Sequence, residues 1–253
     1  MTRWPLAWLA AAPLAPWLIA QGRRVRRVIP LLPEPPGDRE GRWCLMGPQT
    51  STTVRILFLG DSSMAGVGAA HQQQALSGAL GTLVHQPEGP LQVAWQIRAR
   101  TGWRTRDSLA FLSSHDVPDQ ADMVVVALGV NDVTALQSAR GFRADVNRLN
   151  THLQSRCGAR QVFWCGLPPV HRFSALPQPL RSVLGRKAVE LDAVLQALGS
   201  GYWPMPARFE DEWIASDGFH PGPQAYQAWA RALAPELRRA IFQAAGFHAS
   251  IRG

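Results

Sequence analysis

The segment Val54–Ser63, with the sequence VRILFLGDSS, indicates the fold of this chain. Its first six residues are apolar except Arg55, and the run ends at a Gly-Asp-Ser-Ser turn. A continuous apolar run of this length is typical of a strand buried on both faces of a parallel sheet. The strand would fix the backbone, and the turn would expose the hydroxyl of Ser62 at the carboxyl end of the strand.

Apolar runs alternate with helical periodicity from Val54 onward. The runs predict strands over 54–59, 91–97, 122–128, 161–166 and 201–205. The segments between them predict helices near 68–85, 106–114, 139–156 and 180–198, with a last helix after Pro223. Short strands that alternate with helices indicate an α/β fold, in which helices cover both faces of a parallel sheet.

Four segments carry candidate catalytic residues. Three of them follow predicted strands, and the fourth lies near the C-terminus. Ser62 follows the first strand, Gly102 the second, and Asn131 the third, while residues 217–221 read DGFHP. Ligands of doubly wound sheets bind beyond the carboxyl ends of the strands, so these loops converge on one edge. A serine at a strand tip, paired with a distant Asp-x-x-His, is the arrangement that a serine esterase needs.

These segments resemble the motifs of the SGNH (GDSL-type) hydrolases, a family of esterases and lipases. The resemblance covers roughly 54–240 and implies a flavodoxin-like three-layer α/β/α sandwich with a five-stranded parallel sheet. Ser62 matches the family's nucleophile, His220 its base and Asp217 the acid that orients the base. Ser63 stands where the family has leucine.

The resemblance also implies an oxyanion hole and a mechanism. The donors would be the backbone N–H groups of Ser62 and Gly102 and the side-chain amide of Asn131. Ser62 would form an acyl-enzyme that water hydrolyses, and no metal or organic cofactor is required. The predicted substrate is a small-molecule or lipid ester. An acyltransferase with the same acyl-enzyme, or a membrane-tethered binding protein without turnover, remains an alternative.

Each assignment also has a structural alternative. Ser62 alone would equally suit a helix cap, Asn131 and Asp217 a turn, and His220 a surface loop. Asp61 and Asp132 are expected to hold their loops by hydrogen bonds. The apolar, proline-rich segment 167–180 suits an acyl pocket or partial lid, or equally a loop that packs on its own domain.

The charge and the cysteine content indicate which other classes of function are not expected. The formal net charge is +8, but the first 53 residues hold 7 arginines against 3 acids, so the rest is only mildly basic. Without a basic stripe with interleaved aromatics, nucleic-acid binding is not expected. The 3 cysteines fit no zinc motif, and Cys157 and Cys165 are expected to be buried free thiols.

The N-terminal residues are expected to form two separate parts before the hydrolase domain at 54–253. Residues 1–27 hold an uncharged apolar stretch at 4–20, about 25 Å long as a helix, followed by four arginines. We expect membrane association through 4–27, with the domain on the cytoplasmic side of the inner membrane or in the cytoplasm. The alternative is an apolar arm packed on the domain or on a partner. Residues 28–53 have the Pro/Gly-rich composition of a linker.

Overall fold

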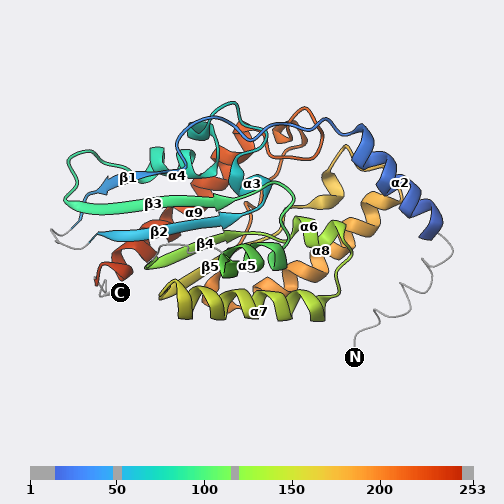
Figure 1. The fold of residues 1–253 in the computed structure, drawn as a ribbon. Helices are drawn as coiled ribbons and strands as arrows, with labels where there is room; N and C mark the ends of the chain where they lie inside the picture. The colour runs from blue at the N-terminus through green and yellow to red at the C-terminus, as the bar shows by residue number, and fades with distance from the viewer. Residues whose placement is uncertain (1–14, 48–52, 115–119, 247–253) are drawn as a thin grey trace.

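Six strands form one mixed sheet in the computed structural model, which describes residues 15–47, 53–114 and 120–246. The strand order is β1-β3-β2-β4-β5-β6, of which Figure 1 labels β1 to β5. The strands are β1 (Glu40–Leu45), β2 (Val54–Gly60), β3 (Leu91–Ala99), β4 (Met123–Ala127), β5 (Gln161–Cys165) and β6 (Tyr202–Trp203). Strands β2 to β6 pair in parallel, which confirms the flavodoxin-like α/β prediction. The predicted count of five strands was too low, because β1 pairs antiparallel with β3 at the sheet edge.

Helices occupy the connections between the strands. They are α2 (Ala15–Val28), α3 (Ser62–Ala65), α4 (Leu76–Val84), α5 (Thr105–Ser114), α6 (Val130–Thr134), α7 (Ala139–Arg156), α8 (Leu180–Gln196) and α9 (Pro223–Ala244). Short 3-10 helices are η2 (Gln72–Gln74), η3 (Val170–Arg172), η4 (Gly199–Gly201) and η5 (Asp211–Trp213). α4 begins later than the predicted helix near 68–85, because Gly68 has a φ of 97° and His71 and Ala75 have extended backbone, which an α-helix excludes.

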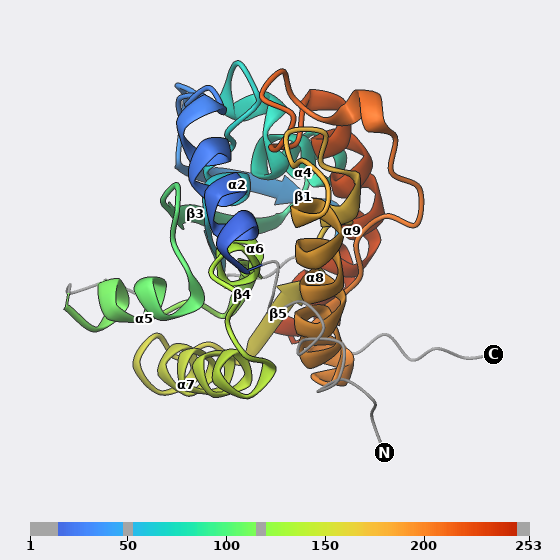
Figure 2. The same cartoon turned by 90° about the vertical axis from the view of Figure 1, so that its right-hand side faces the viewer.

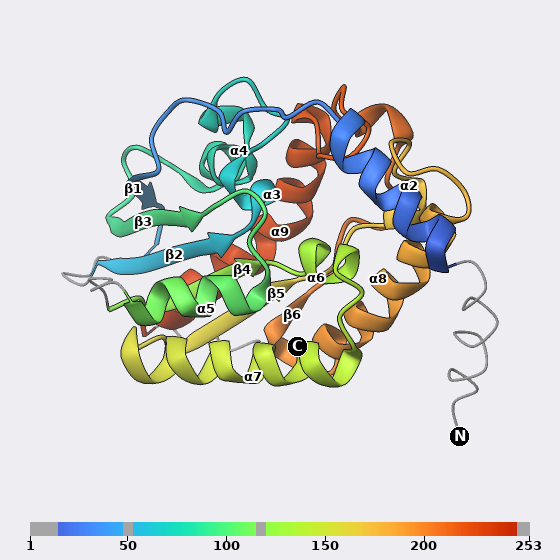
Figure 3. The ribbon, with the colours of Figure 1, turned by 45° about the vertical axis from the view of Figure 1, so that its right-hand side comes forward.

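The central strands are buried on both faces because alternate side chains point to opposite sides of the sheet. Ile56 and Phe58 of β2 pack in the core under α4 and α9. Leu57 and Leu59 pack in the core under α5, α7 and α8. The views agree on these two helical layers (Figures 1 and 3). The layered packing explains why the β2 sequence is a continuous apolar run.

α2 and β1, which precede β2 in the chain, pack on the domain. α2 places Leu18 and Val25 against the core under α8. The side chain of Gln21 donates to the Gln178 carbonyl at 2.7 Å and accepts from the Leu180 N–H at 3.3 Å. Figure 2 shows α2 in front of the sheet, on the side that carries the loops after the strands.

These observations change the expectations for the N-terminal residues. The predicted linker 28–53 contains β1, so residues 40–45 belong to the sheet. Most of the apolar stretch 4–20 lies outside the described residues. Between residue 15 and residue 246, as far as the structure describes them, no helix combines the length and hydrophobicity that crossing a membrane requires.

Candidate active site

Ser62, His220 and Asp217 form a continuous line of hydrogen bonds. The Nε2 atom of His220 lies 2.9 Å from Oγ of Ser62, and its Nδ1 atom lies 2.5 Å from Oδ2 of Asp217. The side chain of Asp217 is fully buried, whereas that of His220 is 15% exposed. A serine hydroxyl that contacts an imidazole oriented by a carboxylate can lose its proton to the ring as it attacks a carbonyl.

The turn after β2 explains how Ser62 is presented. Asp61 caps α3, and its Oδ1 atom accepts hydrogen bonds from the N–H of Ser63 at 2.9 Å and from its hydroxyl at 2.8 Å. The first residue of α3 is therefore Ser62, whose hydroxyl stays free to face His220. A side chain at Gly60 would lie 2.3 Å from Cβ of Met64, so only glycine fits before the turn. The expectation that Asp61 holds its loop is confirmed.

One short loop positions both Asp217 and His220. The second carboxylate oxygen of Asp217 accepts the backbone N–H of Phe219 at 2.9 Å and that of His220 at 3.0 Å. Burial raises the pKa of Asp217, but hydrogen bonds from His220 and from the Phe219 N–H outweigh burial and lower the pKa below its ordinary value. The carboxylate is therefore ionised at neutral pH.

Gly102 and Asn131 lie on two loops that are linked to each other. Gly102, with φ of 87°, lies in a turn that the Trp103 N–H closes on the Arg100 carbonyl at 3.2 Å. The side-chain amide of Asn131 donates to the Trp103 carbonyl at 3.0 Å. The Arg100 N–H donates to the Gly60 carbonyl at 3.3 Å, which sets the turn beside the end of β2. The oxyanion-hole roles of Ser62, Gly102 and Asn131 stay predictions.

Asp132 adds a second link between the same loops. Its Oδ2 atom accepts the N–H of Thr105 at 3.1 Å and its hydroxyl at 3.0 Å. Burial raises the pKa of Asp132 to about 6, although the Thr105 hydrogen bonds oppose the shift. The expectation that Asp132 holds its loop is confirmed.

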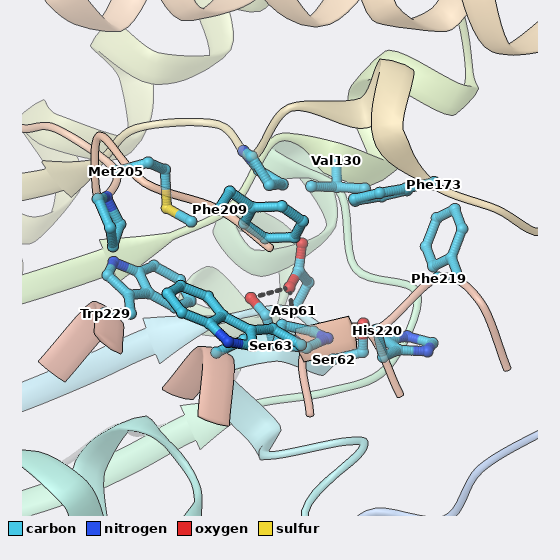
Figure 4. A pocket seen from close by; sticks show the side chains of 15 residues that line it. Asp61, Ser62, Ser63, Val130, Phe173, Met205, Phe209, Phe219, His220 and Trp229 are labelled. Atoms are coloured by element: carbon cyan, nitrogen blue, oxygen red, sulfur yellow. Dashed lines mark hydrogen bonds between the residues drawn. The ribbon is translucent and has the colours of Figure 1, made fainter. Parts of the chain in front are cut away.

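An apolar pocket opens beside Ser62 and His220. Its volume is about 650 Å³, which includes the part that is open to solvent. Its walls are mainly aromatic and aliphatic, with contributions from Val130, Pro168, Phe173, Met205, Phe209, Trp213, Phe219 and Trp229. Figure 4 shows Met205 and Trp229 at one end of the pocket, with Phe219 and His220 at the other.

Most of this lining was not predicted from the sequence. Pro168 and Phe173 come from the segment 167–180, which was expected to form an acyl pocket or lid. The larger share comes from residues after β6 and from α9. The density of aromatics over 203–219, which begins within the last predicted strand and continues beyond it, was the signal that would have indicated them.

Comparisons with known proteins agree with this fold. The sequence profile of the GDSL-like Lipase/Acylhydrolase family matches residues 58–228. A search of curated protein sequences found no match. Among solved structures, a putative arylesterase from Agrobacterium tumefaciens is 17% identical, with 74% of this chain and 99% of that chain covered and a TM-score of 0.55.

Two further solved structures have similar folds. A carbohydrate acetylesterase family member from Sinorhizobium meliloti is 17% identical over 74% of this chain and 99% of that chain, with a TM-score of 0.53. A lipase/acylhydrolase from Enterococcus faecalis is 20% identical over 74% of this chain and 96% of that chain, with a TM-score of 0.50. Because the family profile spans well over half of the sequence, the chain belongs to the GDSL-like Lipase/Acylhydrolase family.

Proposed function

We propose that this hydrolase cleaves carboxylic esters through an acyl-enzyme on Ser62. The observation that carries the proposal is the hydrogen-bonded line of Ser62, His220 and Asp217 at the mouth of an apolar pocket. Membership of the family supports ester hydrolysis in general. The geometry supports Ser62 as the nucleophile, His220 as the base and the apolar lining as the wall against which an acyl group would lie.

The proposed reaction is acyl transfer in two steps. Oγ of Ser62 attacks the ester carbonyl while Nε2 of His220 takes its proton, and the imidazolium then protonates the leaving alcohol. Water enters, gives a proton to His220 and attacks the acyl-enzyme, which releases the acid and restores Ser62. The ionised Asp217 stabilises the positive ring in both steps.

The backbone N–H groups of Ser62 and Gly102 and the amide of Asn131 are the proposed donors to the oxyanion. Gly102 suits this role because a Cβ built on it meets no heavy atom within 4 Å, so the space beside its Cα is open to a substrate. The loss of one oxyanion donor typically lowers kcat by about 10²- to 10³-fold.

The pocket supports an ester with an apolar acyl group. Its lining offers aromatic and aliphatic surface, while the polar groups are concentrated at Asp61, Ser62, Ser63 and His220. An acyl chain would therefore be buried with its carbonyl at the polar end. The acyl chain length that the enzyme prefers would distinguish a small ester from a lipid-like ester as the substrate.

The N-terminal residues support a proposed location at an anionic membrane surface. Arg23, Arg24, Arg26 and Arg27 all have exposed side chains on α2. On the same helix, Trp17 is 53% exposed and Ile19 is 54% exposed. Basic side chains with neighbouring aromatic and aliphatic groups favour the interface of an anionic bilayer, here on its cytoplasmic side.

Hydrolysis of p-nitrophenyl esters from acetate to palmitate tests the proposed function, with the Ser62→Ala variant beside the wild type. Turnover that is lost in the variant would support the acyl-enzyme, and the preferred chain length would give the substrate class. If folded wild-type protein gave no turnover with water but transferred the acyl group to an added alcohol, the protein would be an acyltransferase. Absence of both reactions would favour a binding protein.

A further inference from the structure

Residues 30–39, here called the N-terminal strap, connect α2 to β1 and contact two loops of the candidate active site. They lie outside the segment that matches the family, which begins at residue 58. The sequence alone indicated a linker. The structure instead shows hydrogen bonds that join the strap to Thr101 and to Gln72, whose side chain also binds the end of α3, so a structural role in the site follows from these contacts.

Glu34 binds the turn that carries Gly102. Its Oε1 atom accepts the backbone N–H of Thr101 at 2.9 Å and the Thr101 hydroxyl at 2.9 Å. Its Oε2 atom accepts Nη1 of Arg39 at 2.8 Å. Burial raises the pKa of Glu34, but the hydrogen bonds from Thr101 and Arg39 outweigh burial, so the carboxylate is ionised at neutral pH.

Arg39 fixes Glu34 to the end of β3. Its Nη2 atom donates to the Ala99 carbonyl at 2.6 Å, and its own carbonyl accepts the Ile97 N–H at 2.6 Å. Glu34 and Arg39 therefore hold the chain on both sides of Arg100, where the turn begins. A carboxylate fixed in this way acts as a rigid acceptor rather than as a mobile surface charge.

The strap also supports the nucleophile helix α3. Gln72 is 3% exposed, and its side-chain amide donates to the Ala65 carbonyl of α3 at 2.9 Å and to the Pro35 carbonyl at 3.4 Å. The Gln72 N–H donates to the Pro36 carbonyl at 2.9 Å. Pro35 itself is buried and lies against Gly66, the residue that ends α3.

We infer that Glu34 is a positioning residue that orients the Thr101–Gly102 peptide for the oxyanion. The inference rests on the proposed function, because it assigns a purpose to the Gly102 N–H. In a turn of this kind the central peptide can rotate, and the φ of 87° at Gly102 is the value that a type II turn requires. The two hydrogen bonds that Glu34 accepts fix the Arg100–Thr101 peptide and the Thr101 side chain, and so restrict rotation of the Thr101–Gly102 peptide that follows.

Kinetics of Glu34→Ala on p-nitrophenyl acetate test this inference. We expect kcat to fall by about 10- to 100-fold with KM within about twofold, because a misplaced donor weakens transition-state binding only. Glu34→Gln keeps an acceptor for Thr101 and should recover part of the loss. Asp38→Ala, which removes an exposed carboxylate from the same strap, is the matched control and should equal the wild type.

A double-mutant cycle distinguishes positioning from general stabilisation. Gly102→Ala strains the same turn, because alanine rarely adopts a φ of 87°. If Glu34 acts through the turn, Glu34→Ala should lower kcat little further in the Gly102→Ala background. A full additional loss would overturn the inference, and so would an equal loss of kcat in Asp38→Ala.

Measuring Ser62→Ala beside these variants distinguishes failure of the inference about Glu34 from failure of the proposed function. Ser62-dependent turnover that is unchanged in Glu34→Ala would overturn the inference and leave the proposed function intact. Wild-type turnover that does not depend on Ser62 would overturn both. Circular dichroism of each variant would confirm that the compared proteins are folded.

Discussion

Two adjacent serines at the end of β2 have different surroundings. The hydroxyl of Ser62 contacts His220 at 2.9 Å, whereas that of Ser63 donates to Asp61 at 2.8 Å. Only the first serine is next to a base. Ser63 therefore stabilises the turn and its cap, and its replacement should affect the geometry slightly rather than the chemistry.

Substitution of each serine separates these roles. We expect Ser62→Ala to lower kcat by at least about 10⁴-fold, because the three residues act as a unit. Ser63→Ala should retain turnover within a few-fold of the wild type, since the Ser63 N–H still binds Asp61. Initial rates on p-nitrophenyl butyrate would measure both effects. The opposite ranking of the two variants would assign the nucleophile to Ser63.

Asp132 gives a prediction for stability against pH. Its pKa is raised from 3.8 to about 6, chiefly by burial, with the neighbouring Asp145 and Asp61 adding to the shift. Because the pKa of this carboxyl is higher in the folded than in the unfolded protein, its protonation stabilises the fold. This contribution is fully present when the pH is below the unfolded pKa of 3.8, and it is lost as the pH rises through about 6. Asparagine at position 132 does not titrate. The pH dependence contributed by all other groups is common to both proteins, so it cancels when their stabilities are compared.

We therefore expect the stability of the wild type relative to Asp132→Asn to fall by about 2 kcal/mol between pH 4 and pH 8. Urea unfolding of both proteins at several pH values would measure the difference. A difference that is constant across this range would show that Asp132 has an ordinary pKa.

At the scale of single elements, the loops after β5 and β6 and the start of α9 build the pocket. Phe209 lies before η5 and lines the pocket together with Trp213. The two rings pack edge to face, with centroids 6.4 Å apart. Phe209 therefore limits the space that is open to an acyl chain, and its removal should enlarge the pocket without touching Ser62.

Phe209→Ala should move the preferred acyl chain of p-nitrophenyl esters to greater length. The expected ratio of kcat/KM for decanoate to that for acetate rises by about tenfold, because each additional buried CH₂ contributes about 0.8 kcal/mol. Phe242→Ala, at the far end of α9, is the matched control, because Phe242 packs against the core and is not among the residues that line the pocket. An unchanged ratio in Phe209→Ala would place the acyl chain elsewhere.

The elements differ in how well the sequence predicts them. β2 and β4 were predicted because burial on both faces leaves an uninterrupted apolar run. β1 was not, because its sequence EGRWCL follows a proline-rich segment and its pairing with β3 is a tertiary contact. β6 is shorter than predicted, because it ends at Trp203, before a proline that cannot donate to the ladder.

The same distinction holds for the site. The proximity of Ser62, Asp217 and His220 could be predicted because each lies in a short motif with a chemical requirement. The pocket could not, because its lining comes from separate segments that no local pattern joins. The contacts of Glu34 were also hidden, since a glutamate in a proline-rich segment reads as a solvated linker residue.

At the scale of the whole molecule, the net positive charge is concentrated near the N-terminus. α2 packs its Leu18 and Val25 inward and leaves its four arginines outward. Each arginine near an anionic bilayer contributes about 1 kcal/mol of binding. α2 would thus place a basic surface on the side of the molecule that carries the loops of the site.

Sedimentation with lipid vesicles tests this surface. The wild type should sediment with vesicles that contain phosphatidylglycerol, and replacement of Arg23, Arg24, Arg26 and Arg27 by glutamine should weaken binding by about 10²- to 10³-fold. Turnover of a soluble ester should not change. The matched control replaces four exposed arginines on α7, α8 and α9, namely Arg140, Arg143, Arg186 and Arg231. Equal losses in the two variants would argue against a specific role for α2.

The central claim is that Ser62, activated by His220, forms the acyl-enzyme. Its most direct test is covalent labelling with a fluorophosphonate, followed by peptide mass spectrometry to locate the modified residue. We predict one label on Ser62 in the wild type, and none on that residue in His220→Ala within the same reaction time. Labelling of Ser63, or labelling of Ser62 at an equal rate without His220, would contradict the account.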